Sequence, residues 1–321
     1  MNSKIIKALK IILPLSLGVF LIWYSLASAT EKEKEDLLHY ISNANLGWVV
    51  LSICLGLISH LSRAYRWNYL LKPLGYSVGL PNSFMAVMAG YLANLGIPRS
   101  GELIRAGLVS TYEDVPFKKS FGTIISERVV DLIMLCLIIA ITLVFESETL
   151  LSYLGNKLAN PLMTVGFLII GILIGVVLLK LLKRSSNPFA IRIRNFGEGL
   201  LEGIKSIYKL KNRWGFIFHT IFIWFLYVVM FYVIKFTVPG GSEIGMGAIL
   251  VTFVAGSLAI SLTNGGIGVF PIAISVVLLL YNIDKSIGLA YGWILWGSQT
   301  AITIIFGALS FLFLPVLNRN K

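Results

Sequence analysis

The most constraining feature of this chain is the length of its apolar blocks, which run for roughly 17 to 25 residues between charged or Pro/Gly-rich breaks. An α-helix needs about 20 apolar residues to cross the hydrocarbon layer, and in lipid it satisfies its own backbone groups. With 57% hydrophobic and 13% charged residues, the chain has more apolar surface than a soluble core can hide. The sequence therefore predicts an all-α, polytopic membrane helix bundle.

Six blocks are long enough for full crossings, and two further apolar regions are broken in the middle. The predicted crossings are residues 11–29, 46–61, 122–145, 161–182, 215–236 and 286–314. A Gly-Ile-Pro run at 96–98 interrupts region 81–109, and an Asn-Gly-Gly-Ile-Gly run at 264–268 interrupts region 246–281. Each region is predicted to be a re-entrant helical hairpin, because glycine and proline end a helix at the break. Hairpins that enter from opposite faces suggest the inverted repeat of many transporters.

The basic residues predict the orientation of the bundle. If both broken regions are hairpins, 22 of the 27 Lys and Arg residues lie on the same side as the two termini. The other side keeps five basic residues beside eight acidic ones. This bias predicts a multi-pass protein of the cytoplasmic (inner) membrane with both termini in the cytoplasm. It also accounts for the net charge of +12, so no nucleic-acid partner is expected.

Two segments outside the central crossings carry their own signals. The first block ends in an Ala-Ser-Ala run at 27–29 that resembles a signal-peptidase site, so a cleaved signal is an alternative to a retained helix. Its length of about 19 residues favours the retained helix. Residues 188–212 separate apolar and charged positions at helical spacing, which predicts an amphipathic helix on the cytoplasmic leaflet. Residues 1–321 are predicted to form a single integral membrane domain.

Six charged residues lie beside the first break and at the start of the next crossing. They are Arg99, Glu102, Arg105, Glu127, Arg128 and Asp131. The spacing predicts that the first three share one sector of a helix and the last three share a sector of the following helix. Because ionisable groups at membrane depth are costly, such residues usually line an internal cavity. The alternative is that Glu102 pairs with Arg105, and Arg128 with Asp131, merely to fix helix ends.

The second break carries no charge and supports a weaker hypothesis. Its glycines allow a tight turn and close backbone approach. A half-helix that begins near Pro271 would point backbone N–H groups at an anion. Helix packing explains the glycines equally well.

The other chemistry-bearing residues form no recognisable site. Cys54 and Cys136 lie in separate apolar blocks and are predicted to be core residues. The three histidines share no metal-ligand spacing, and no nucleophile elbow or phosphate-binding loop occurs. We therefore expect no enzyme activity, no cofactor and no metal.

Taken in order, these motifs resemble the flippase-like transmembrane domain of the lysylphosphatidylglycerol synthases, the multiple peptide resistance factors, and its stand-alone relatives. The resemblance covers nearly the whole chain. It rests on Arg66-Trp67, on Asn94 with the Pro-Arg-Ser-Gly-Glu run at 98–102 and Arg105, on Glu127-Arg128 and Asp131, and on the Gly-Gly-Ile-Gly-Val run at 265–269. Asn264 and Pro271 occupy places where the family commonly has a proline and an acidic residue. We expect a stand-alone member without the aminoacyl-transferase domain.

The resemblance implies a domain that binds a lipid headgroup and moves it between leaflets, in the best-known relatives an aminoacylated phosphatidylglycerol. We accordingly expect a phosphate-bearing lipid or glycolipid headgroup, held by the arginines. The carboxylates would hold the guanidinium groups or meet a cationic part of the substrate. The expected substrate-binding set is Arg66, Asn94, Arg99, Glu102, Arg105, Glu127, Arg128, Asp131, Asn264, Gly265 and Gly266.

Two other functions and several partners stay open. The chain would fit a membrane-embedded enzyme of polyprenyl or phospholipid metabolism, for which Glu127 and Asp131 are the candidate acidic pair. It would also fit a structural partner of a lipid synthase. The expected partners are membrane lipids, anionic ones first, with a homo-oligomer or a lipid synthase as further possibilities.

Overall fold

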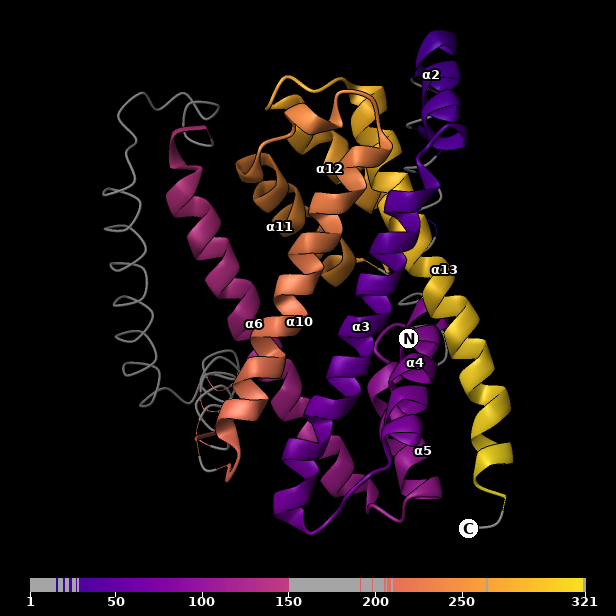
Figure 1. Ribbon diagram of the computed structural model, residues 1–321, viewed down its shortest axis with the longest axis vertical. Helices are drawn as coiled ribbons and strands as arrows, with labels where there is room; N and C mark the ends of the chain where they lie inside the picture. The colour runs from indigo at the N-terminus through magenta and orange to yellow at the C-terminus, as the bar shows by residue number, and fades with distance from the viewer. Residues whose placement is uncertain are drawn as a thin grey trace.

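The computed structural model describes residues 29–149, 210–263 and 265–319, with a few single positions in the remaining segments. Every regular element among these residues is a helix, which confirms the predicted all-α membrane bundle. Four helices are long and apolar enough to cross a membrane: α3 (Leu46–Leu71), α6 (Phe117–Phe145), α10 (Arg213–Ile234) and α13 (Lys285–Leu317). They correspond to four predicted crossings (Figure 1). Most of the predicted crossing at 11–29, the whole crossing at 161–182 and most of the amphipathic helix at 188–212 lie outside the described residues.

Each broken region forms two short helices joined by a turn. The first contains α4 (Leu80–Gly96) and α5 (Gly101–Tyr112), and the second contains α11 (Met246–Leu262) and α12 (Val269–Leu279), with the two helices of each pair in contact. Both turns point toward the middle of the bundle, from opposite ends (Figure 1). The tips meet there, since a Cβ added at Gly265 would lie 3.1 Å from Leu95 Cδ2. The depth of these hairpins in a membrane stays a prediction.

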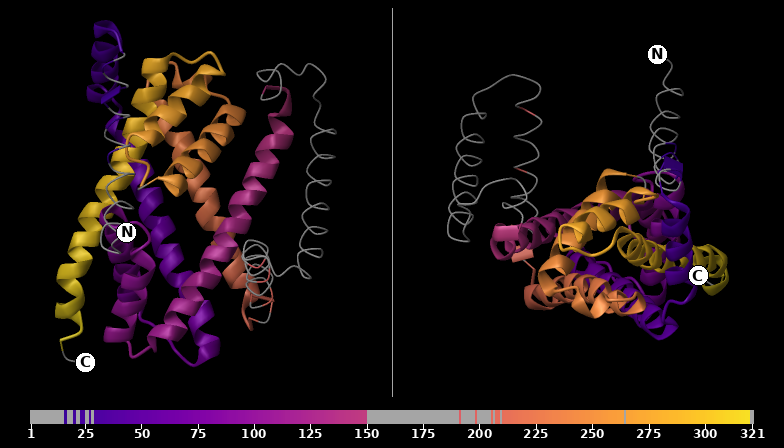
Figure 2. Two further views of the ribbon diagram at one scale, coloured as in Figure 1. Left: turned by 180° about the vertical axis from the view of Figure 1, so that it is seen from behind. Right: turned by 90° about the horizontal axis from the view of Figure 1, so that it is seen from above.

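Helix α13 connects the two hairpins, because it packs against both α12 and α4. Gly288 and Gly292 make the first contact close: an added Cβ would lie 2.7 Å from Ser275 Cα and 2.6 Å from Pro271 Cα, respectively. Small residues at such contacts let membrane helices approach without a side chain between them. Helix α6 contacts the other side of both hairpins, α5 near its start and α11 farther along, as the rear view shows (Figure 2).

A short helix that the hydropathy pattern did not predict precedes α3. It is α2 (Glu31–Ser42), and a capping box begins it: the Glu33 N–H donates to Thr30 Oγ1, and the Thr30 N–H donates to the Glu33 carboxylate at 2.7 Å. That backbone hydrogen bond is the main reason why the pKa of Glu33 lies below its ordinary value. Lys285 Nζ, 3.3 Å from Glu33 Oε1, joins α2 to α13.

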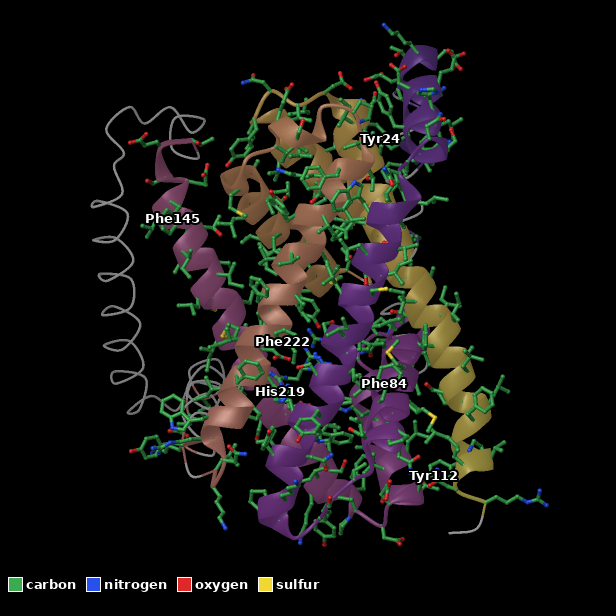
Figure 3. All side chains as sticks on the ribbon, in the orientation of Figure 1. Tyr24, Phe84, Tyr112, Phe145, His219 and Phe222 are labelled. Carbon is green, nitrogen blue, oxygen red and sulfur yellow. The ribbon has the colours of Figure 1, made fainter. Side chains whose placement is uncertain are left out.

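The ends of the bundle differ in charge. Tyr112 and Phe145, which end α5 and α6, lie at opposite ends (Figure 3). Lys72, after α3, and Lys118 and Lys119, in the first turn of α6, lie toward the Tyr112 end, whereas the Phe145 end carries Glu146, Glu148 and Glu243. This separation is the one on which the predicted orientation depends.

The two cysteines lie on the outside of the bundle rather than in its core. Cys54 on α3 and Cys136 on α6 are free and exposed, so their predicted core location is wrong. Both core and lipid-facing positions of a membrane bundle are apolar, and hydropathy therefore does not separate them.

Candidate functional site

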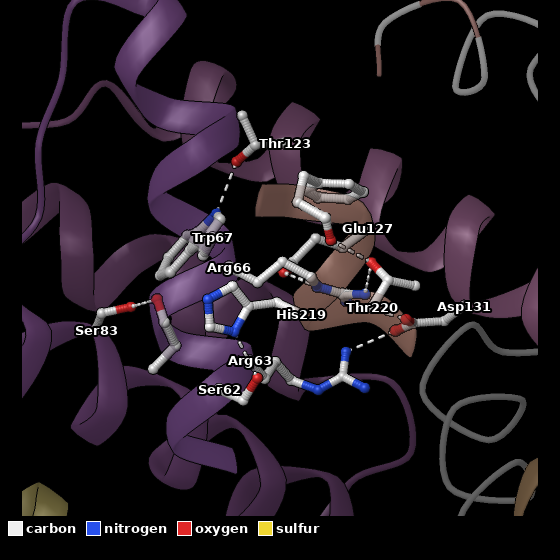
Figure 4. Close-up of polar contacts among 12 residues, drawn as sticks. Ser62, Arg63, Arg66, Trp67, Ser83, Thr123, Glu127, Asp131, His219 and Thr220 are labelled. Atoms are coloured by element: carbon white, nitrogen blue, oxygen red, sulfur yellow. Dashed lines mark hydrogen bonds and ion pairs between the residues drawn. The ribbon is translucent and has the colours of Figure 1, made fainter. Parts of the chain in front are cut away.

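A cluster of ion pairs lies where α3, α5 and α6 meet, close to α10. Figure 4 shows its part around Arg63, Arg66, Glu127 and Asp131. The charged members of the cluster are Arg63 and Arg66 from α3, Glu102 and Arg105 from α5, and Glu127, Arg128 and Asp131 from α6. All of these pairs join different helices. The alternative of ion pairs within α5 and within α6 is therefore not what the structure contains.

Asp131 holds the two arginines of α3. Its carboxylate accepts from Arg63 Nη1 at 2.6 Å and from Arg66 Nη2 at 3.0 Å. Helix α10 completes the contacts, since Arg66 Nη1 donates to Thr220 Oγ1 at 3.0 Å and Arg63 Nη2 donates to Tyr227 OH at 3.3 Å. These bonds keep α3 helical beyond its predicted end at residue 61, because they allow both arginines to be buried.

Glu127 joins α5 to the same network. It accepts from Arg105 Nη1 at 2.6 Å, and Arg66 Nε lies 3.5 Å from its other oxygen. The Arg105 guanidinium also lies over the Trp67 ring, with Cζ 3.8 Å from the ring centroid. Trp67 is fixed in turn, because its Nε1–H donates to Thr123 Oγ1 at 2.8 Å. Glu127 is only 1% exposed.

The pair between Glu102 and Arg128 is the most exposed of the cluster. Arg128 Nη2 lies 2.9 Å from Glu102 Oε1, and the two side chains are 19% (Glu102) and 40% (Arg128) exposed. Glu102 occupies the first turn of α5, and the turn before it is fixed by the Gly101 N–H, which donates to Asn94 Oδ1 at 2.7 Å. Gly101 also touches the Gly90 carbonyl so closely that no side chain fits between α4 and α5.

The cluster carries an excess of positive charge. Each of the four guanidinium groups has a carboxylate partner, but they face only three carboxylates, so the cluster has a net excess of one positive charge. Several buried atoms also lack a hydrogen-bond partner among the described residues, among them Arg105 Nη2, Arg105 Nε and Arg63 Nε. Buried donors of this kind are rare in native proteins, and here they favour an anionic ligand.

These groups face a small cavity. Arg63, Glu102, Arg105 and Arg128 line it together with polar Tyr91 and Asn94. Its open volume is about 10 Å³, roughly the space of one water molecule. In this conformation the cavity is closed to a lipid headgroup.

Some predicted site residues lie apart from the cluster. Arg99 precedes α5 in a left-handed conformation, with a φ of 62°, so its predicted place on one helical face with Glu102 and Arg105 is wrong. Its side chain is exposed and makes no hydrogen bond or ion pair with the described residues.

The predicted residues of the second break form the tip of the other hairpin. Gly265 and Gly266 have φ values of 68° and 77°. The Gly265 carbonyl accepts from Trp296 Nε1 at 2.8 Å, and the Gly266 N–H donates to Thr263 Oγ1 at 3.1 Å, so these groups serve the turn itself. Asn264 lies outside the described residues.

Sequence reasoning missed part of the site. Arg63 is absent from the predicted set, although its spacing of three from Arg66 places both on one face of α3. Thr220 and Tyr227 of α10 carry no charge and stand in an apolar block. Only the packing of α10 on α3 identifies them.

Comparison with known proteins extends over most of the chain. Residues 11–307 match the family described as the lysylphosphatidylglycerol synthase TM region. The UPF0104 membrane protein MJ1595 of Methanocaldococcus jannaschii is 24% identical over 80% of this chain and 81% of its own length. The UPF0104 membrane protein PH1989 of Pyrococcus horikoshii is 25% identical over 88% of this chain and 90% of its own length. No solved structure matches the chain.

Proposed function

The chain belongs to the lysylphosphatidylglycerol synthase transmembrane family, and we propose from this that it binds a phosphate-bearing lipid or glycolipid headgroup and moves it across the membrane. The cluster of buried arginines is the observation that carries the proposal. Its uncompensated positive charge and the free Arg105 Nη2 would attract an anionic headgroup. The charge difference between the ends of the bundle supports a cytoplasmic membrane location with the Tyr112 end inside.

Within the cluster, the arginines would have different roles. Arg63 and Arg66 are held by Asp131, Glu127 and α10 and would act as the fixed base of the site. Arg105 and Arg128 face the cavity and would contact the headgroup. Because the cavity is closed, entry requires the hairpin α4–α5 to move relative to α6.

The enzyme alternative is less well supported. It needs Glu127 and Asp131 as a free acidic pair, but each carboxylate lies against two guanidinium groups. Carboxylates neutralised in this way are poor ligands for a catalytic metal and poor bases. The geometry therefore favours binding over catalysis.

Transport assays on an Arg105→Lys variant test the proposal. Lysine keeps the charge opposite Glu127 but loses the second guanidinium nitrogen, which is buried without a hydrogen-bond partner among the described residues. In liposomes with a fluorescent phosphatidylglycerol, we expect about tenfold slower movement between leaflets, the effect of one charge-assisted hydrogen bond. Arg319→Ala, which removes an exposed arginine near the C-terminus, is the matched control and should transport at the wild-type rate. Normal transport by a folded Arg105→Lys protein would contradict the proposal.

A further inference from the structure

Glu102 differs from the other two carboxylates of the cluster in the number of arginines with which it pairs. Glu127 and Asp131 each pair with two arginines, although Glu127 Oε1 lies 3.5 Å from Arg66 Nε and accepts no hydrogen bond. Glu102 uses only Oε1, while its Oε2 is buried without a hydrogen-bond partner among the described residues. A carboxylate with one arginine partner and an unpaired buried oxygen is a weaker structural anchor than one held by two arginines, because the unpaired oxygen costs desolvation free energy.

The position of the Glu102–Arg128 pair is equally distinctive. Glu102 and Arg128 line the cavity from α5 and α6, and they are the most exposed charged members of the cluster. Breaking their contact would open the cavity without disturbing the buried pairs behind it, which join Arg105 to Glu127 and α3 to Asp131. The carboxylate of Glu102 is thus bound to Arg128, the arginine that an incoming phosphate could reach first.

We propose that Glu102 is a built-in competitor for the anion: its carboxylate holds Arg128 and closes the cavity until a phosphate group replaces it. The inference rests on the proposed function, and it reverses the expected effect on headgroup affinity of removing the Glu102 carboxylate. A carboxylate that helped to bind the headgroup would weaken binding when removed. A competing carboxylate strengthens binding when removed, because Arg128 becomes free and the cluster gains a second uncompensated positive charge.

Lipid binding by the Glu102→Gln variant of the full chain tests this. Glutamine keeps the shape of the side chain and loses the charge. We expect the apparent Kd for dioleoylphosphatidylglycerol in detergent to fall about two- to fivefold, the range for a partly exposed ion pair. Asp114→Asn removes an exposed carboxylate just beyond the same helix and should bind like the wild type. If the wild type binds phosphatidylglycerol, unchanged or weaker binding by Glu102→Gln would overturn the proposal.

The source of the phosphate is distinguished by parallel titrations. Dioleoylphosphatidylcholine reports the contribution of acyl chains without net charge, and free glycerol 1-phosphate reports the headgroup alone. If Glu102→Gln increases the affinity for phosphatidylglycerol alone, the ligand is a lipid. An equal increase in affinity for glycerol 1-phosphate also supports the competition by Glu102, but it assigns the anion to a soluble source.

A lipid-free measurement separates failure of this inference from failure of the proposed function. Val87 lines the same cavity and is 2% exposed, so Val87→Cys in a protein with Cys54→Ala and Cys136→Ala reports access to the cavity. Adding Glu102→Gln should raise the rate of N-ethylmaleimide labelling about two- to fivefold. Faster labelling without any lipid binding would retain the closing role of Glu102 and reject the lipid as ligand. Unchanged labelling together with unchanged binding would reject the inference.

Discussion

The α4–α5 and α11–α12 hairpins both place a glycine-containing turn in the middle of the bundle, but only the first is surrounded by charge. Arg105 and Glu102 of α5 pair with residues of α6. The sequence of α11 and α12 contains no charged residue, and most of its buried apolar side chains belong to the largest apolar core of the described residues. The two hairpins therefore meet tip to tip with opposite chemistry.

This difference indicates that the two hairpins have different mechanical roles. The second hairpin is held by close apolar contacts, such as those of Gly256 with Phe270 and of Gly292 with Pro271. Such contacts resist displacement, because a well-packed apolar interface tolerates little movement. The first hairpin is held against α6 by ion pairs beside a cavity, and ion pairs can exchange one anion for another. We infer that the α4–α5 hairpin moves during transport while the α11–α12 hairpin serves as a fixed wall.

The largest expected effect is an all-or-none labelling difference between the hairpins. If they enter from opposite faces, an impermeant thiol reagent should label Glu243→Cys, before α11, in intact cells. It should leave Asp114→Cys, after α5, unlabelled until the cells are lysed. Both variants need Cys54 and Cys136 replaced by alanine, because these cysteines are exposed. Labelling of both positions from outside would remove the basis of the comparison.

Removal of the central carboxylate of the charged hairpin's network should have the largest effect on stability. Glu127→Ala leaves Arg105 without its carboxylate partner in a buried site, which costs roughly 3 to 5 kcal/mol when one member of a buried pair is removed. We expect lower yield and a lower midpoint of thermal unfolding, measured by size-exclusion chromatography with fluorescence detection.

The matched control is Glu148→Ala, which removes an exposed carboxylate beyond the other end of α6 and should leave the midpoint unchanged. If Glu127→Ala were as stable as this control, the network would contribute little to folding, and the first hairpin would not depend on its ion pairs.

The packing of the apolar hairpin should respond to added volume rather than to charge. In Gly292→Ala the new Cβ would lie 2.6 Å from Pro271 Cα, a backbone atom, so we expect a loss of about 1 to 3 kcal/mol in the free energy of unfolding. Gly297→Ala, on the same helix with nothing within 4 Å, should gain up to about 1 kcal/mol from helix propensity. Equal stability of the two variants, in denaturant titrations, would show that α12 and α13 are not tightly packed.

Much of the fold could be predicted from the sequence, because the length of an apolar block identifies a membrane-crossing helix and a glycine- or proline-containing break identifies a hairpin. The four described crossings and both hairpins begin within five residues of the predicted positions, as α6 illustrates by starting at Phe117 instead of 122. The end of α3 was missed because Arg63 and Arg66 look like a membrane surface until their partners are known. Helix α2 was missed although its Thr30–Glu33 capping box is visible in the sequence, since the search depended on apolar length.

The candidate site was only partly accessible to sequence reasoning. Spacing identified the charged residues of α5 and α6, because a helix fixes which side chains share a face. It did not identify the pairing between helices, which depends on how α5 packs against α6. Arg99 shows the same limit. The spacing predicted that the helix of Glu102 and Arg105 also includes Arg99, whereas Arg99 has a left-handed conformation and precedes the helix.

The smallest expected effect concerns Arg99 at the tip of the charged hairpin. A left-handed conformation costs a residue with a side chain roughly 1 to 2 kcal/mol, part of which glycine recovers. Arg99→Gly should therefore stabilise the protein by about 0.5 to 1 kcal/mol in thermal unfolding. If the exposed guanidinium attracts the headgroup on its way to the cavity, the same variant should transport more slowly, so that stability rises while transport falls.

Asp114→Gly separates the backbone effect of Arg99→Gly from its charge effect. Asp114 is also exposed and left-handed, with a φ of 52°, but it follows α5 at the end remote from the hairpin tip. Asp114→Gly should show the same gain in stability with unchanged transport. The two variants both remove the free-energy cost of a left-handed backbone, but only Arg99→Gly removes a charge from the hairpin tip. Arg99→Lys should retain most of the transport, since the charge remains at the tip. Wild-type transport by Arg99→Gly would confine the site to the buried cluster, and the tip of the first hairpin would then be no more functional than that of the second.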